Sequence, residues 1–528
     1  MPAILDRLQG WFVFHLRMSY SGSTSMVEDD DLPLVPPMVT DAFCDKMERD
    51  LANPLLPAMV VLPTGVGKSG VMCMTPFAAL PTMCCKSLAV SRSMRVLVVC
   101  PNTEVKLQMV AAFRGFYRDR FDLQDAPIVT ELSTDTIITA SQEALQHCET
   151  SKSTSSKSSS SFPEVFVATY QSLSRPQLLH AIPTDAFDLI LVDEAHHTEA
   201  LSYRVILERF CGSVFVSRHR CLCVFFTGTP YRSHSHEILR AVPIYQCTLR
   251  DALDRPVPYI KHPCYEPLKI ESMTLRHRHS GHVVTLSSFE EIASESGNQL
   301  AQVICRSDDA CLSLIGAVIQ KLRQIRPVKS NSNGSTTGVL AQALLQASDT
   351  DEAEKLVRLW NNHSENQDPS PHLSIAAVHS GMAKVAQEMV LTRLKGHQLD
   401  AIVHVGMLGE GFDHPPLFVV AIFKPFASMP PFVQLVGRVL RRFPSAASTN
   451  YENRAFVLAH PALGLHRHWK LYKMDNENNN GLQDNVEDQI SPTENDDSEL
   501  NGAPSRKWSE YELLSQEQSS NGTKEDWF

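Results

Sequence analysis

The sequence predicts an α/β fold of two tandem domains, each built on a parallel sheet flanked by helices. First, the chain has 528 residues, which is too long for a single hydrophobic core. Second, short apolar runs alternate with helical patterns along two separate stretches, and this alternation is typical of parallel sheets covered on both faces. Third, a soft Ser- and Asn-rich linker, 329–338, precedes the strand candidates of the second stretch.

The first domain is expected to span 36–248. Its strand candidates are the apolar runs 58–62, 95–100, 164–168, 189–192 and 222–226. A Ser-rich run, 151–161, cannot bury a core, so we expect a flexible surface insertion there. Residues 1–35 are expected to form a flexible N-terminus, and Arg7 and Arg17 leave a transit peptide open as an alternative.

The second half of the chain begins with a more helical pattern at 249–330, which we expect to form a helical connector. The second domain, 331–472, has no phosphate loop of its own; its strand candidates are 339–343, 373–378, 400–405, 418–423 and 455–458. Residues 473–528 are rich in Asn, Asp, Glu and Ser, which predicts a disordered acidic tail. Trp508 and the pair Trp527–Phe528 are candidate anchors in that tail for a protein partner.

The charge distribution excludes a globally basic surface. The net charge is −11, and residues 474–528, with 14 acidic and three basic side chains, account for all of it. Any nucleic acid must therefore be held by a local groove, backbone amides and a few cations. No run of 18 apolar residues is present, so we expect no membrane span.

The cysteine pattern indicates a reducing compartment. The 13 cysteines are scattered and form no C-x-x-C pair, as expected of reduced core cysteines in an intracellular protein, nuclear or cytoplasmic, with a mitochondrial location left open. His277, His279 and His282 have ligand-like spacing but lack a flanking cysteine or acidic helix, so a polar loop is favoured over a metal site.

A glycine-rich turn after the first apolar run carries the chemistry. The sequence VVLPTGVGKS at 60–69 leads a strand into a turn that ends in Lys68 and Ser69. Gly65 and Gly67 let backbone N–H groups approach a polyphosphate, Lys68 can reach the β- and γ-phosphates, and Ser69 offers a hydroxyl to Mg²⁺. The strict pattern has Gly where this chain has Leu62.

An acidic pair follows a second apolar run. The run FDLILV at 187–192 ends in Asp193 and Glu194. At the end of a parallel strand, Asp193 would hold Mg²⁺ and Glu194 would activate the attacking water. A helix cap is the default for a lone acidic pair, but the order of strand, phosphate loop, helix, strand and acidic pair favours an ATPase.

Further segments occur in the order found in superfamily-two helicases. They are LVVCPN at 97–102, VATYQS at 167–172, FTGTPYR at 226–232, VHSGM at 378–382, MLGEGFD at 407–413 and QLVGRVLR at 434–441. The doubled His196–His197 and the segment SYRVILERF at 202–210 resemble the DEAH-type branch of this superfamily, closest to the motor subunits of type III restriction enzymes and the repair helicase UvrB. The resemblance covers about 60–442.

This resemblance implies two RecA-like domains with an ATP cleft between them, using ATP and Mg²⁺. The residues implied to contact nucleotide are Thr64, Gly65, Val66, Gly67, Lys68, Ser69, Gly411 and Asp413. Those implied in catalysis are Glu194, His196, Gln434, Arg438 and Arg441, the two arginines sharing one face if 435–442 is helical. Nucleic acid would be contacted by Pro101, Asn102, Thr169, Ser380, Gly381 and Gly409, and coupling would pass through Thr227, Gly228 and Thr229.

The sequence departs from the family before the phosphate loop, where no glutamine occurs at 32–39 to read adenine. Adenine selectivity is therefore left open. We expect an ATP-dependent helicase or translocase that acts on DNA in preference to RNA. Two alternatives are an ATPase that clamps or remodels complexes without separating strands, and a degenerate scaffold without activity. The oligomeric state is also left open.

Overall fold

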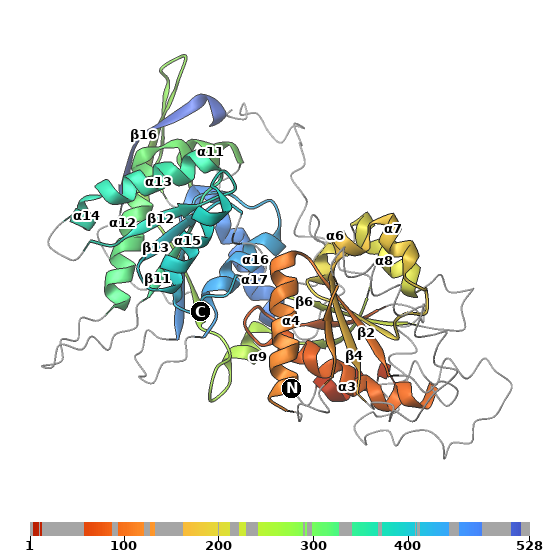
Figure 1. Ribbon diagram of the computed structural model, residues 1–528. Coiled ribbons are helices and arrows are strands. Elements are labelled where there is room, and N and C mark those ends of the chain that lie inside the picture. Colours follow the sequence, from red (N-terminus) through yellow and green to blue (C-terminus); the bar gives the residue numbers. More distant parts are fainter. Residues whose placement is uncertain are drawn as a thin grey trace, which may run out of the picture. The chain divides into compact units, whose positions relative to one another are not determined.

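The computed structural model divides the chain into two compact units, 1–247 and 248–528 (Figure 1). The residues that the structure describes are 4–9, 11–12, 57–86, 93–120, 127–132, 162–198, 200–211, 221–228, 241–288, 291–292, 298–326, 341–367, 372–406, 408, 412–442, 453–477 and 508–518. The expected insertion, 151–161, and the pair Trp527–Phe528 lie outside these ranges.

The first unit is built on a seven-stranded parallel sheet. In chain order its strands are β1 (Ala58–Val61), β2 (Arg95–Cys100), β3 (Val129–Glu131), β4 (Glu164–Thr169), β5 (Leu189–Val192), β6 (Leu222–Thr227) and β7 (Val242–Gln246). Their order across the sheet is β3-β4-β2-β5-β6-β1-β7. All residues of β1, β5 and β6 are buried, as expected of strands covered on both faces.

Helices cover this sheet. The helices α6 (Tyr170–Leu173), α7 (Pro176–Ala181) and α8 (Leu201–Cys211) pack on one face, where Met59, Leu97 and Ile190 form a cluster with Tyr203 and Phe210. The helices α3 (Lys68–Lys86) and α4 (Thr103–Arg118) pack against each other, and their residues Phe77 and Tyr117 lie with ring centroids 5.5 Å apart. The first expected domain is therefore a helix-flanked parallel sheet.

The N-terminal residues differ from the expected flexible segment. Residues 4–9 and 11–12 are helical, and Ile4, Leu8, Trp11 and Phe12 are buried. Arg7 donates a hydrogen bond of 3.1 Å to the carbonyl oxygen of Ile244, the residue at the centre of β7. The spacing of these apolar residues places them on one helical face, and their burial makes this part of the N-terminus a packed element of the first unit.

The second unit contains a six-stranded parallel sheet. Its strands are β8 (His262–Pro267), β11 (Gln342–Gln346), β12 (Ile375–Val378), β13 (Ala401–His404), β14 (Leu417–Ile422) and β15 (Arg454–Ala459). The order is β12-β13-β11-β14-β15-β8. The described helices of this unit are α9 (Leu249–Leu253), α11 (Asn298–Arg306), α12 (Asp308–Ile325), α13 (Thr350–Asn362), α14 (Ser364–Gln367), α15 (Lys384–Lys395), α16 (Met429–Val439) and α17 (Leu465–Glu477). The described 3₁₀ turns are η2 (Ala195–His197) in the first unit, and η3 (Pro461–Leu463) and η4 (Trp508–Glu510) in the second. The prediction of two parallel-sheet α/β domains is confirmed.

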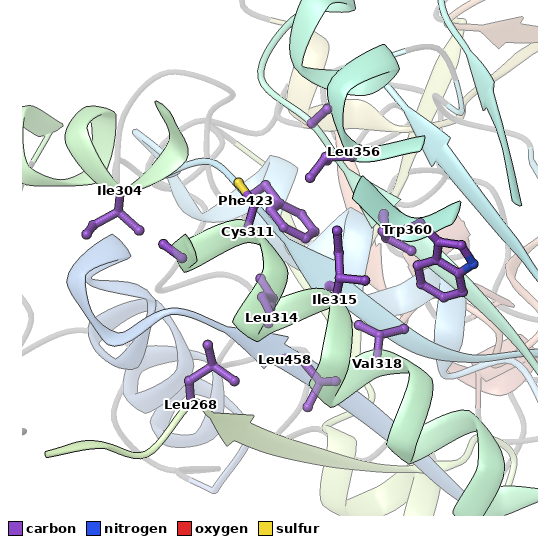
Figure 2. Packing of buried hydrophobic residues seen from close by; sticks show 14 of the residues in the cluster. Leu268, Ile304, Cys311, Leu314, Ile315, Val318, Leu356, Trp360, Phe423 and Leu458 are labelled. Atoms are coloured by element: carbon purple, nitrogen blue, oxygen red, sulfur yellow. The ribbon is translucent and has the colours of Figure 1, made fainter. Parts of the chain in front are cut away.

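The core of the second unit lies between this sheet and α12 and α13. Figure 2 shows Leu314, Ile315 and Val318 of α12 beside Trp360 of α13 and Leu458 of β15. Trp360 is fully buried, and its ring N–H donates to the carbonyl oxygen of Leu373 at 2.8 Å. The indole thus satisfies its polar group while filling the core.

The expected helical connector, 249–330, is wrong in part. The strand β8 forms the edge of the second sheet by pairing with β15, and β9 (Ile270–His277) and β10 (Val283–Leu286) form an antiparallel hairpin. The helices α11 and α12 of the same stretch supply much of the core. The stretch is therefore part of the second unit, because its apolar residues are buried against the sheet.

The expected disordered tail also needs correction at 508–518. There η4 (Trp508–Glu510) leads into β16 (Tyr511–Gln518), which pairs antiparallel with β9 in a three-stranded sheet of order β10-β9-β16. Trp508 and Tyr511 are buried in the core of the second unit, so Trp508 is a packing residue there. In the part of the chain that is described, no helix has both the length and the apolar character needed to cross a membrane.

Candidate active site

The phosphate loop follows β1 and ends at the first residue of α3. Gly65 and Gly67 have φ of 94° and 103°, a conformation that glycine adopts without strain. The N–H groups of Gly70 and Val71 already bond the carbonyl oxygen of Gly67, at 3.0 and 3.2 Å. Leu62 is buried and its N–H bonds the Thr227 carbonyl at 2.9 Å, so it continues β1 and has no need for glycine.

Lys68 lies against both carboxylates of the acidic pair. Its Nζ is 2.9 Å from Oδ1 of Asp193 and also contacts Oε1 of Glu194. The strands β1 and β5 both neighbour β6, and their carboxyl ends meet at one edge of the sheet, which brings together residues more than 120 positions apart. Thr64, Val66 and Ser69 belong to the same loop and first helical turn, and the Ser69 side chain is exposed.

The charges of this cluster perturb one another. Burial acts to lower the pKa of Lys68, but the negative charges of Asp193 and Glu194 outweigh it and hold that pKa above its usual range. Burial raises the pKa of Asp193, and the nearby Lys68 opposes the rise. The ammonium therefore stays charged and is the cation that neutralises the pair.

Glu194 has an unusual backbone conformation. Its φ of 49° lies in the left-handed region, which is rare for a residue with a side chain. Its N–H donates to Oδ1 of Asp193 at 3.0 Å, and its Oε2 lies 3.4 Å from Nδ1 of His196. Such a strained residue persists only when its surroundings hold it, and this is typical of functional positions.

His196 connects the acidic pair to the end of β6. The imidazole is buried, and its Nδ1 lies 3.5 Å from the Oγ1 of Thr227. A Cβ placed on Gly228 would lie 3.5 Å from the Oγ1 of Thr64 and 3.6 Å from the carbonyl oxygen of Leu62, so the β6 end runs directly beside the phosphate loop. Thr229 lies outside the described residues.

The predicted nucleic-acid residues of the first unit lie at the ends of β2 and β4. Asn102 caps α4 by accepting a 2.9 Å hydrogen bond from the N–H of Val105, and Thr169 caps α6 through Ser172. Gln171 donates a hydrogen bond of 2.8 Å to the carbonyl oxygen of Pro101. It lies in the motif at 167–172 but is not among the predicted nucleic-acid contacts. This bond holds the two segments together.

The predicted residues of the second unit gather around α16. Arg438 is buried and donates to the carbonyl oxygen of Phe412 at 3.2 Å, while Arg441 forms an ion pair with Asp413. The condition for the two arginines to share a helical face, a helix over 435–442, is not met: α16 ends at Val439, and Arg441 forms an isolated antiparallel bridge with Ile260. The two arginines are thus held by different backbone elements.

The remaining predicted residues lie on a turn, on α16 or outside the described ranges. Ser380 and Gly381 are exposed in the turn after β12, and a Cβ on Gly381 would meet the His379 ring at 3.1 Å. Gln434 lies on α16, and Gly409 and Gly411 lie outside the described residues.

Lys261 was missed by the sequence reasoning. It is fully buried, and its Nζ donates to the carbonyl oxygens of Pro415, Leu417 and Val439, at 2.8, 2.7 and 3.3 Å. Burial holds the pKa of Lys261 well below its usual range. The side chain joins the segment after Asp413 to the last residue of α16, and no local pattern around a lone lysine could have predicted these partners.

His277, His279 and His282 lie at the end of β9 and in the turn that follows it. His277 pairs through Nε2 with Oε2 of Glu510 at 2.9 Å. Within the described ranges, no group of three or more His, Cys, Asp or Glu side chains is arranged to hold a metal ion. The preferred interpretation of a polar loop agrees with the turn between β9 and β10.

Two family models match the sequence. Residues 39–232 match that of the type III restriction enzyme res subunit, and residues 336–443 match the helicase conserved C-terminal domain. A Saccharomyces cerevisiae protein, named as a provisional ATP-dependent helicase, IRC3, is 22% identical over 282 residues. That match covers 53% of this chain and 35% of the yeast protein, so the chain matches about a third of its relative's length.

Solved structures with a similar fold include two nucleic-acid complexes. S. cerevisiae Dbp5 bound to RNA and ADP BeF3 is 11% identical, and the alignment covers 84% of this chain and 93% of the Dbp5 chain with a TM-score of 0.43. The Type ISP restriction-modification enzyme LlaBIII bound to DNA is 16% identical, and the alignment covers 82% of this chain and 27% of the LlaBIII chain with a TM-score of 0.43.

Proposed function

We propose that this chain couples Mg²⁺-ATP hydrolysis to movement along nucleic acid, with DNA favoured over RNA. It belongs to the superfamily-two helicases related to the motor subunit of type III restriction enzymes. The observation that carries the proposal is the contact of Lys68 with Asp193 and Glu194 beside a phosphate loop. A cation and two carboxylates thus meet at one sheet edge, which supports a metal-holding role for Asp193 and a general-base role for Glu194.

The donor set suits Mg²⁺ with ATP. The exposed hydroxyl of Ser69 and the carboxylate of Asp193 are hard oxygen ligands of the kind that Mg²⁺ prefers. When bound, the ion would neutralise charge on the phosphates. Lys68 would exchange its carboxylate contacts for the β- and γ-phosphates, and the backbone of Thr64 to Gly67 would surround them. Glu194 would then be free to take a proton from water.

Coupling would run through His196. Its Nδ1 lies between Glu194 and Thr227, at 3.4 and 3.5 Å. A shift of Glu194 on hydrolysis would alter the contact to Thr227, which ends β6 beside the phosphate loop. Thr229 would continue this path by resemblance, and Gly228 lies beside the phosphate loop.

Nucleotide turnover would need the second unit as well. By resemblance, Gln434, Arg438 and Arg441 belong to a family motif that acts on the γ-phosphate, and Gly411 and Asp413 belong to one that contacts the nucleotide. Arginine contributions of this kind are worth roughly 10³ to 10⁵ in rate. Support comes from the match to the helicase C-terminal domain and from the fixed position of the buried Arg438.

Nucleic acid would be held through its backbone. Pro101, Asn102 and Thr169 lie where helices begin after β2 and β4, and Ser380, Gly381 and Gly409 would add small polar contacts from the second unit. Small side chains and backbone amides suit phosphate oxygens and discriminate bases poorly, so the binding would be independent of sequence.

The test is an ATPase assay with no polymer, single-stranded DNA, duplex DNA or RNA. We expect stimulation by a polymer, and Glu194→Gln should still bind ATP while hydrolysing it at least about a hundredfold more slowly. A wild-type protein without ATPase activity would instead identify a scaffold. ATPase stimulation without displacement of an annealed strand would identify a clamp, and stimulation by RNA alone would contradict the preference for DNA.

A further inference from the structure

The hairpin of β9 and β10 projects from the second unit beside β16 (Figure 1). Its root is apolar: Met273 and Leu275 of β9 and Leu286 of β10 are fully buried in the core cluster, and Val284 is nearly so. Its tip is polar, with all residues from Arg278 to His282 exposed. The hairpin is therefore anchored at one end and presents a turn to solvent at the other.

The hairpin is also held along its length. His277 bonds Glu510 at 2.9 Å, and its ring lies edge-on to that of Tyr511, with centroids 5.0 Å apart. Arg276 forms an ion pair with Glu512. Gly281, at φ 69°, allows the chain to reverse, and its N–H bonds the His277 carbonyl at 2.9 Å. The tip is thus presented on a braced support.

The charge of the hairpin changes from root to tip. Between residues 272 and 288 the sequence has two arginines, three histidines and no acidic residue. Near the root, Glu512 of β16 pairs with Arg276, and Glu510 at the end of η4 pairs with His277. No described acidic side chain pairs with Arg278, so its guanidinium and the imidazoles of His279 and His282 leave the tip rich in hydrogen-bond donors.

We propose that this tip, residues 278–282, binds the sugar–phosphate backbone of the nucleic acid on which the protein acts. Guanidinium and imidazole N–H groups are donors suited to phosphate oxygens, and the Ser280–Gly281 turn leaves room for a strand to approach. A protein partner would require a large apolar or aromatic anchor, and Val283 is the one large apolar side chain exposed beside the tip in the described hairpin. The inference rests on the proposed function and adds a contact outside the helicase motifs.

The experiment compares the 528-residue protein with a triple variant, Arg278→Ala, His279→Ala and His282→Ala. Binding of fluorescein-labelled single-stranded DNA, duplex DNA and single-stranded RNA is measured from 50 to 200 mM salt, roughly the range over which phosphate contacts dominate. We expect a roughly five- to tenfold rise in Kd and a salt slope smaller by about one, with unchanged ATPase activity in the absence of polymer. Lys470→Ala, which removes an exposed cation on α17, is the matched control and should bind as the wild type does.

Further results distinguish a phosphate contact at the tip from a protein contact, and failure of the hairpin proposal from failure of the proposed function. Arg278→Lys should keep most of the affinity, since an exposed contact to backbone phosphates depends mainly on the positive charge, which lysine also carries. Unchanged polymer binding by the triple variant, with the wild type still stimulated by polymer, would overturn the hairpin proposal and leave the proposed function standing. A poly-glutamate peptide serves as a probe for an acidic protein partner. If the triple variant lost binding to this peptide and kept its binding to nucleic acid, the hairpin proposal would also be overturned. A wild type that binds none of the polymers would overturn both.

Discussion

Replacing Trp508 by alanine should destabilise the second unit strongly. The side chain is 6% exposed and belongs to the same core cluster as the helices α11 and α12. Its ring lies 5.2 Å from that of Tyr511, the first residue of β16. Truncation of a buried tryptophan costs about 3–5 kcal/mol, because it removes apolar burial and leaves a cavity. A unit of this size loses roughly 2–4 °C per kcal/mol, so we expect the Tm to fall by about 6–20 °C.

The assay is thermal unfolding of the purified protein followed by circular dichroism. Leu514→Ala is the matched control, since this leucine lies on β16 and is 39% exposed, and its loss should change stability by well under 1 kcal/mol. Trp508→Phe should recover part of the lost stability by refilling some of the volume. Equal Tm values for Trp508→Ala and Leu514→Ala would refute the assignment of η4 and β16 to the core.

The remaining predictions concern the site and the pH dependence. Lys68→Ala should abolish ATP turnover, because the β- and γ-phosphates would lose the cation proposed to hold them; near-normal hydrolysis by the purified variant would contradict the site. Arg438→Ala should keep ATP affinity and lose most polymer-stimulated turnover, and Arg438→Lys should rescue poorly, as measured by separate nucleotide-binding and turnover assays. Burial lowers the pKa of His404 to about 3, with Arg438 and Lys424 adding to the effect, and lowers that of His414 and His460 to about 4. Since the unfolded chain takes up these protons near pH 6.5 and the folded chain does not, stability should be full above about pH 6.5 and fall toward pH 4; a flat urea-unfolding profile between pH 7 and 5 would contradict this.

The parallel sheets could be predicted because their central strands are buried on both faces. Runs such as 95–100 and 189–192 are continuously apolar, and the structure places strands there. The strand β7 was missed because it lies at the sheet edge and contains the exposed Pro243, so its residues do not form a continuously buried apolar run. The strands β8 and β16 were missed because their partners, β15 and β9, are remote in the sequence.

The nucleotide site could be predicted in part for a similar reason. The phosphate loop and the acidic pair are local motifs, and parallel strand ends bring them to one edge. The left-handed Glu194 and the bond from Gln171 to Pro101 depend on the folded backbone, so no sequence pattern indicates them. The same holds for Lys261, whose three acceptors come from two segments more than 150 residues away.

The pairing of β9 with β16 has a consequence for synthesis of the chain. His277 of β9 and Glu510, the residue just before β16, are hydrogen-bonded and 233 residues apart. At about 5–20 residues per second, a ribosome would take roughly 10–50 s to make the partner strand after β9 emerges. During that interval β9 presents an unpaired strand edge beside Met273 and Leu275, and such edges recruit other chains. Nascent chains of this protein are therefore expected to need protection by a chaperone until β16 is complete.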